Sequence, residues 1–184
     1  NYITQNHPSV QGNNLPPDNV IFIECFVETK SGKASSVIHD ITYSRLGDND
    51  IKQETSRFGG GFKILPVMRC YAGSLHMVNT NKYLAKKKVG NGTQCKCKRV
   101  KLNKGVRPTW KNWDGHKVFT VLANEVEFVE FEHYPSTPKG ASKIFQLKPE
   151  KVRVTIDFPL ASHKNGLRIK RGKVKVTQLP VNCN

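Results

Sequence analysis

The chain has 184 residues, a formal net charge of +16 and an isoelectric point near 9.8. This charge exceeds what solubility requires and favours a polyanionic partner, while the absence of any run of about 18 apolar residues excludes a membrane-spanning segment. The sequence begins at Asn1 without an initiator methionine and ends at Asn184 directly after a strand-like run, so we expect a fragment.

Strands are the dominant prediction along the chain. The apolar run Asn19–Val27 is rich in β-branched and aromatic residues and should be covered on both faces. Between Thr93 and Leu102 the alternation slips, which predicts a bulge at Lys98 or Arg99. Further strands are predicted over Val126–Phe131, Val152–Phe158, Leu167–Ile169 and Val174–Leu179, the last two joined through Gly172.

The remaining segments are predicted mostly as loops. Only Asn79–Lys88 has a helical signal, for one or two turns with Tyr83 and Leu84 facing inward, before Gly90-Asn91-Gly92 ends the helix. Pro, Gly and Ser predict loops over Asn6–Asp18, Lys30–Ser36 and Gly59–Gly61. Periodicity alone therefore predicts a mainly antiparallel β module of short strands and long loops.

The cysteines number five and show no disulfide framework, which fits a nuclear or cytoplasmic protein. Cys95 and Cys97 would place both sulfurs on one face of a strand. A tetrahedral zinc site needs a second ligand pair, which the sequence lacks, although His76 or His116 could complete one. We therefore predict buried apolar thiols and no metal, with a zinc-bound module as the weaker alternative.

Residues 80–120 concentrate cations, with Asp114 as the single acid. Tyr83, Trp110, Trp113 and Phe119 are interleaved with them, and such a mixture can neutralise phosphates and stack bases. The alternative is a solvated basic surface with the rings in the core, although burying both tryptophans in so polar a loop is difficult. The predicted nucleic-acid contacts are Lys86, Lys87, Lys88, Lys96, Lys98, Arg99, Lys101, Lys104, Arg107, Trp110 and Trp113.

Acidic residues gather in two other stretches, Asp40–Glu54 and Glu125–Glu132. This separation predicts that the cations of the middle and C-terminal segments are nearly uncompensated and give one strongly positive face. Alternation places Glu130 and Glu132 on a solvated strand face, which argues against a metal-binding carboxylate cluster with Glu127.

No catalytic motif is recognisable in the sequence. Gly59–Gly61, followed by Phe62 and Lys63, lacks the spacing and the hydroxyl residue of a phosphate-binding loop. Neither a nucleophile elbow nor a metalloprotease helix is present. We do not expect this chain to be catalytic or to hold a cofactor by itself.

One pattern resembles a known family. Gly73, Met77 and Asn81, followed after a short stretch by Asn91-Gly92-Thr93, are similar to an element of Pif-type and Helitron-associated DNA helicases. The resemblance implies an Src-homology-three-like antiparallel barrel inserted into the second RecA-like domain. It divides the chain into a linker and partial RecA-like segment (1–64), the inserted barrel (65–158) and a return strand (159–184). The implied fold class is mainly β, with strands of an incomplete RecA-like α/β domain.

The same resemblance implies a function. The chain would be part of an ATP-dependent DNA helicase and would grip single-stranded or forked DNA, with the rest of the helicase chain as its partner. ATP and magnesium would bind the full-length parent and not this segment. The alternative is a stand-alone, non-enzymatic β-barrel that binds RNA, DNA or a peptide.

Overall fold

A computed structural model of the chain describes residues 20–46, 52–53, 64–113, 116–163 and 166–183. The predicted loops Asn6–Asp18 and Gly59–Gly61 lie outside these residues. Three sheets of four, five and five strands make up most of the described structure, and their strand orders are open. The predicted mainly β fold class is confirmed.

The first sheet has the strand order β5-β1-β9-β8. Its strands are β1 (Ile21–Glu24), β5 (Val67–Cys70), β8 (Thr109–Trp113) and β9 (His116–Leu122). β1 pairs antiparallel with β5 and parallel with β9. Phe22 and Ile23 point to opposite faces and are both buried, which confirms the prediction that this strand is covered on both sides.

The second sheet is antiparallel throughout and has the order β11-β10-β7-β6-β14. Its strands are β6 (Leu75–Val78), β7 (Gln94–Leu102), β10 (Val126–His133), β11 (Ile144–Leu147) and β14 (Val181–Cys183). Cys97 pairs with Phe131 and Arg99 with Glu130, which leaves Lys98 as an extra residue. The bulge predicted at Lys98 or Arg99 is therefore confirmed.

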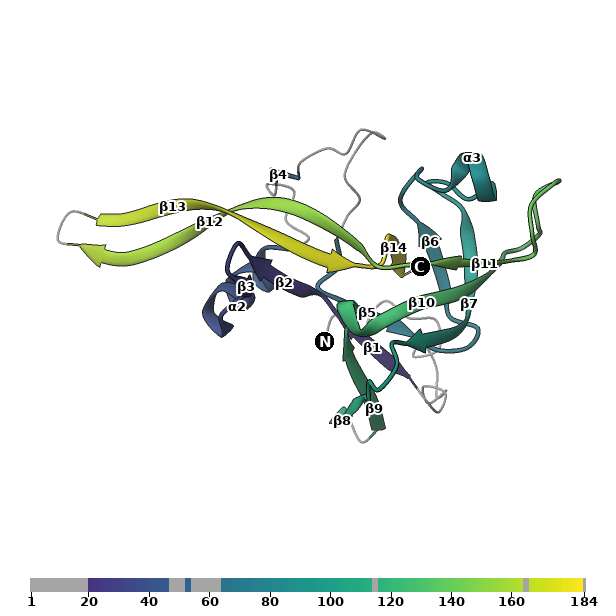
Figure 1. Cartoon of the computed structure of the whole chain (residues 1–184), viewed down its shortest axis with the longest axis horizontal. Coiled ribbons are helices and arrows are strands. Elements are labelled where there is room, and N and C mark those ends of the chain that lie inside the picture. Colours follow the sequence, from purple (N-terminus) through teal and green to yellow (C-terminus); the bar gives the residue numbers. More distant parts are fainter. Residues whose placement is uncertain (1–19, 47–51, 54–63, 114–115, 164–165, 184) are drawn as a thin grey trace.

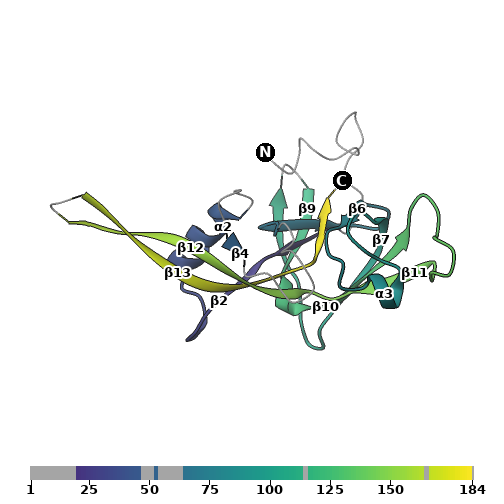
Figure 2. The same cartoon turned by 90° about the horizontal axis from the view of Figure 1, so that it is seen from above.

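The third sheet is built on a long ribbon. Its order is β3-β2-β13-β12-β4, with β2 (Phe26–Thr29), β3 (Gly32–Lys33), β4 (Lys52–Gln53), β12 (Glu150–His163) and β13 (Gly166–Gln178). Figures 1 and 2 both show β12 and β13 extending away from the other two sheets. The two predicted pieces around Gly172 form one continuous strand. Glycine fits at position 172 because a Cβ there would lie 2.8 Å from the Phe158 ring.

Helices are short and few among the described residues. Sequence reasoning missed α2 (Ser36–Arg45), since its β-branched residues favour strand. The predicted loop Lys30–Ser36 is thus wrong in part, because β3 and the start of α2 occupy it. α3 (Leu84–Lys87) is a single turn in which Leu84 is 51% exposed, so the prediction that Leu84 faces inward is wrong. η2 (Ala123–Glu125) joins β9 to β10.

Two main clusters of buried side chains form the core. The first lies between the first two sheets, where Ile23 and Met68 meet Val129 and Phe131. The second lies under the ribbon, where α2 packs against residues such as Val154 and Val176. Hydrophobic burial on both faces of β1 and on the Val27 face of β2 therefore holds the three sheets together.

Gln178 connects the ribbon to the first sheet. Its side chain is fully buried at the end of β13. Nε2 donates to the carbonyl oxygens of Ile23 and Leu65 at 3.2 and 3.0 Å, and Oε1 accepts from the Leu179 amide at 2.9 Å. A buried amide with this set of partners fixes the end of β13 against the first sheet.

Replacing Gln178 by Met keeps its approximate size but leaves two carbonyls and one amide without their partner. We expect Gln178→Met to lower the free energy of unfolding by about 1–3 kcal/mol. Urea denaturation would measure this. Gln146→Met is the matched control, because the Gln146 side chain is exposed and should change stability by less than about 0.5 kcal/mol. Equal stability of both variants would contradict the role of Gln178.

Candidate nucleic-acid interface

The predicted contact residues lie on three elements. Lys86 and Lys87 belong to α3 and Lys88 directly follows it; β7 carries Lys96, Lys98, Arg99 and Lys101; Lys104 and Arg107 lie in the turn that leads to β8. All of these side chains are exposed except that of Lys96, which is half-buried. Figure 1 shows α3 at the upper right beside the second sheet and β8 at the bottom, in the first sheet, so the structure does not bring Lys86 together with Trp110.

The family-motif residues form a compact turn between β6 and β7. The Asn81 Oδ1 accepts from the Asn91 amide at 2.8 Å, and the Thr93 Oγ1 accepts from the Gly90 amide at 3.0 Å. Gly92 has a φ of +88° and donates to the Val78 carbonyl. The motif therefore shapes the backbone that places α3 beside β7.

The other two motif residues belong to the same β6–β7 unit. Gly73 has a φ of +89° and its amide donates to the Cys97 carbonyl at 2.7 Å, which closes the turn before β6. Met77 lies on β6 opposite Gln94 of β7. Both residues thus have a structural role in holding β6 against β7.

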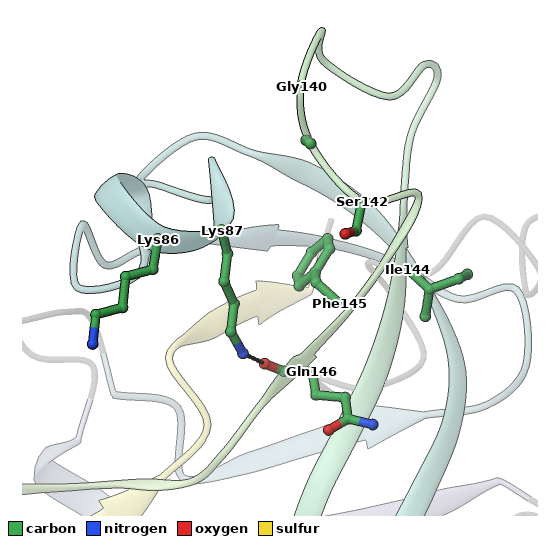
Figure 3. A pocket seen from close by; sticks show the side chains of 8 residues that line it. Lys86, Lys87, Gly140, Ser142, Ile144, Phe145 and Gln146 are labelled. Carbon is green, nitrogen blue, oxygen red and sulfur yellow. Dashed lines mark hydrogen bonds between the residues drawn. The ribbon is translucent and has the colours of Figure 1, made fainter.

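A pocket of about 310 Å³ lies between α3 and the β10–β11 connection (Figure 3). Lys87 Nζ donates to the Gln146 carbonyl at 2.7 Å across it, and Lys86 and Phe145 also line it. Partial burial and the nearby charge of Lys148 lower the pKa of Lys87. In Figure 3 the Lys87 amine is turned to the Gln146 carbonyl and the Lys86 amine points away from Phe145, so the two amines do not converge on one point of the pocket.

The cations on β7 are compensated more than the sequence predicts. Lys98 Nζ lies 3.2 Å from a Glu132 carboxylate oxygen, and Arg99 Nη2 lies 3.3 Å from Glu130. Lys143 also contacts Glu132, and hydrogen bonds from Lys143 and Lys98 lower the pKa of that carboxyl. The predicted uncompensated charge is therefore wrong for Lys98 and Arg99, because antiparallel pairing lays the acidic strand β10 along the basic strand β7.

Trp110 is the exposed aromatic residue of the predicted set. It lies on β8 with 57% of its surface exposed, and the Lys117 Nζ lies 4.7 Å from its ring centroid. Lys117 comes from the neighbouring β9, where it pairs with Asn112 on the same face. The Trp113 side chain lies outside the described part of the chain. The sequence predicted that both indoles could not be buried, and the exposed Trp110 agrees with this prediction.

A second cation–ring pair lies on the second sheet. Lys96 Nζ is 4.2 Å from the ring centroid of Tyr134, which is 38% exposed and directly follows β10. Neither Tyr134 nor Lys117 was in the predicted set. The alternation of β9 could have revealed Lys117, since cross-strand neighbours share a face, whereas Tyr134 depends on the β7–β10 register.

The prediction that the thiols are buried is confirmed for the described cysteines, Cys25, Cys70, Cys95 and Cys97. Cys95 and Cys97 are fully buried, and burial raises the pKa of Cys95 to about 12. His76, named as a possible zinc ligand, is buried with Nε2 2.8 Å from the Ser74 Oγ. Within the described ranges, no three His, Cys, Asp or Glu side chains gather closely enough to hold a metal ion. No helix in those ranges is long and apolar enough to cross a membrane.

Comparisons with known proteins give limited information. No protein-family model matches the chain, and no curated protein resembles it significantly. Among solved structures, unliganded Pif1 from Bacteroides sp is 12% identical, with a TM-score of 0.36 over 79% of this chain and 27% of that one. Bacteroides sp Pif1 in complex with ADP-AlF4 is also 12% identical, with a TM-score of 0.36 over 91% and 30%. The chain thus spans less than a third of either structure, and a likeness this weak assigns no activity.

The turn network makes a prediction about stability. Asn81→Ala removes the acceptor of the Asn91 amide and should lower the free energy of unfolding by about 1 kcal/mol. Asn91→Ala is the matched control, because only its backbone takes part in that hydrogen bond. Thermal or urea unfolding of both variants checks this. A larger loss for Asn91→Ala would show that the Asn91 side chain, and not Asn81, holds the turn.

Proposed function

We propose that the chain binds single-stranded nucleic acid, with Trp110 as its stacking platform. The observation that carries the proposal is an indole that is 57% exposed with a lysine ammonium over its ring. A large exposed aromatic side chain gains little for folding, whereas every base offers it a π-face. Lys117 on β9 and Arg107 just before β8 add positive charge for the adjoining phosphates, whereas Lys111 points to the opposite face of β8 and lies 3.8 Å from a Glu24 oxygen.

The ion pairs of β7 divide the predicted cations into two groups. Lys98 and Arg99 each face a carboxylate, so a phosphate must compete with Glu132 and Glu130 for them. Such exposed pairs are weak and exchange readily. Lys96, which lies over Tyr134, offers a second cation–ring combination of the kind proposed at Trp110. We therefore expect Trp110, Lys117, Lys96 and Tyr134 to contribute more than Lys98 and Arg99.

The pocket beside α3 would bind one further phosphate. Its amines come from Lys86 and Lys87, and Lys148 adds charge nearby. A single strand that reached both the Trp110 surface and this pocket would be held at each place through its phosphates. This arrangement accommodates a backbone-tracking strand and makes no base-specific contact.

We further propose that the chain is a DNA-binding segment of an ATP-dependent helicase of the Pif and Helitron type. Support comes from the resemblance of Gly73, Met77, Asn81 and Asn91-Gly92-Thr93 to that family. ATP and magnesium would then bind the rest of the parent, and single-stranded or forked DNA and the remaining helicase chain would be the partners. The parent would act in the nucleus or cytoplasm.

A second candidate function is that of a self-sufficient β module that binds RNA, DNA or a peptide without a motor. One observation favours it: β1 and β14, the first and last described strands, both pair within the chain and bury side chains such as Ile23 and Val181. Under this proposal the Trp110 surface is the same, but the chain needs no further domain.

The Trp110 platform is tested by binding of a labelled oligothymidine. Trp110→Ala should cost about 1–3 kcal/mol of binding free energy, because it removes a stacked base. Trp110→Phe is the control and should retain most of the affinity, since it keeps a ring. Fluorescence anisotropy across a range of salt concentrations measures both variants. Equal affinity of Trp110→Ala and the unchanged protein would refute the platform.

A further inference from the structure

The third sheet presents a second basic surface, separate from the Trp110 platform. On β12 and β13 the register pairs Lys151 with Thr177, Arg153 with Lys175, Thr155 with Lys173 and Asp157 with Arg171. Directly opposed residues share a face, so these eight side chains lie on one side of the ribbon. The opposite side buries Val154, Ile156, Val174 and Val176.

The charged side of the ribbon has a clear excess of cations. Glu28 of β2 and Lys33 of β3 extend the same face, because Glu28 pairs with both Lys175 and Lys33. Lys151 Nζ lies 2.6 Å from a Glu28 oxygen, and Arg171 Nε lies 3.0 Å from Asp157. Among the described side chains, this face carries two carboxylates and six cations, of which Arg153 and Lys173 also have partners within the chain. The cations are Lys33, Lys151, Arg153, Arg171, Lys173 and Lys175.

Arg153 and Lys175 lie directly opposite each other on this face, and Lys173 precedes Lys175 by two residues on the same face of β13. A polyanion laid across the ribbon can therefore contact cations of both strands at once. Figures 1 and 2 both show the far end of the ribbon extending away from the other two sheets, while its near end pairs with β2.

We propose that this face of β12 and β13 binds the phosphate backbone of duplex nucleic acid. Proteins usually hold single-stranded nucleic acid with aromatic rings that stack on its bases. The described part of β12 and β13 places no ring on this face. Phe158 lies on the opposite side, and Phe26 of β2 is half-buried beside Thr177 at the base of the ribbon. Cations without rings fit phosphate contacts on a duplex, and a two-stranded ribbon fits the major groove.

The spacing of the cations supports this partner. Side chains two residues apart on a strand are about 6.6 Å apart, and adjacent strands are about 4.8 Å apart. Lys173, Lys175 and Arg153 therefore form a close triangle that can contact neighbouring phosphates of one backbone. The inference is independent of the Trp110 platform, because it rests on a different sheet and a different form of nucleic acid.

The test compares two double variants that remove the same net charge. Lys173→Gln/Lys175→Gln neutralises the proposed face, whereas Lys139→Gln/Lys170→Gln neutralises an exposed loop lysine and an exposed lysine on the other side of β13. Each variant is titrated with a labelled 20-base-pair duplex and with oligothymidine at about 0.1 M salt. Thermal unfolding is recorded for each, so that loss of fold is recognised.

The ribbon variant should bind the duplex about tenfold more weakly, with a salt dependence reduced by about two phosphate contacts. Its oligothymidine affinity and the duplex affinity of the control should stay within about twofold of the unchanged protein. Equal duplex binding by both double variants would overturn the proposal. So would a ribbon variant that loses affinity for both nucleic acids equally. Failure of the Trp110 platform would instead appear as weak oligothymidine binding with the duplex result intact.

Discussion

Antiparallel pairing of β7 with β10 places residues on both sides of the second sheet. On the inner side it brings Cys95 and Cys97 together with Val129 and Phe131 in the main core cluster. On the outer side it lays the cations of β7 along the glutamates of β10. The bulge at Lys98 lets β7 supply both the buried cysteines and the exposed cations, because it reverses the alternation between Cys97 and Arg99. The core and the charged surface therefore depend on the same register.

This pairing also explains why charge in the sequence differs from charge on the surface. The sequence separates the basic stretch from the acidic one, but the fold places them side by side. Surface ion pairs of this kind contribute little stability and reduce the positive potential over β7. The cations of α3, Lys117 beside Trp110 and the described cations of the ribbon have no ion pair with the β10 glutamates. The proposed binding surfaces are the places that the β10 glutamates do not reach.

Much of the fold follows from local pattern. Alternation predicted β10 and β12, the slip near Lys98 predicted the bulge, and the dense apolar run predicted a strand covered on both faces. Helix α2 could not be found this way, because Val37, Ile38, Ile41 and Thr42 disfavour helix and only packing against the third sheet compensates. Likewise, the pairings of Tyr134 with Lys96 and of Glu132 with Lys98 depend on long-range register, which one sequence does not contain. The residue types of the candidate site could thus be predicted from the sequence, but their arrangement in space could not.

The central claim is that one protein has two nucleic-acid surfaces with different chemistry, a ring-bearing one at β8 and β9 and a ring-free one on β12 and β13. Mapping of backbone and indole resonances by ¹⁵N nuclear magnetic resonance, during separate titrations with oligothymidine and with a short duplex, tests it most directly. We predict that oligothymidine shifts the Trp110 indole and the amides of β8 and β9, and that the duplex shifts the amides around Arg153, Lys173 and Lys175. Identical shift patterns for both ligands, or no shift at either place, would contradict the account.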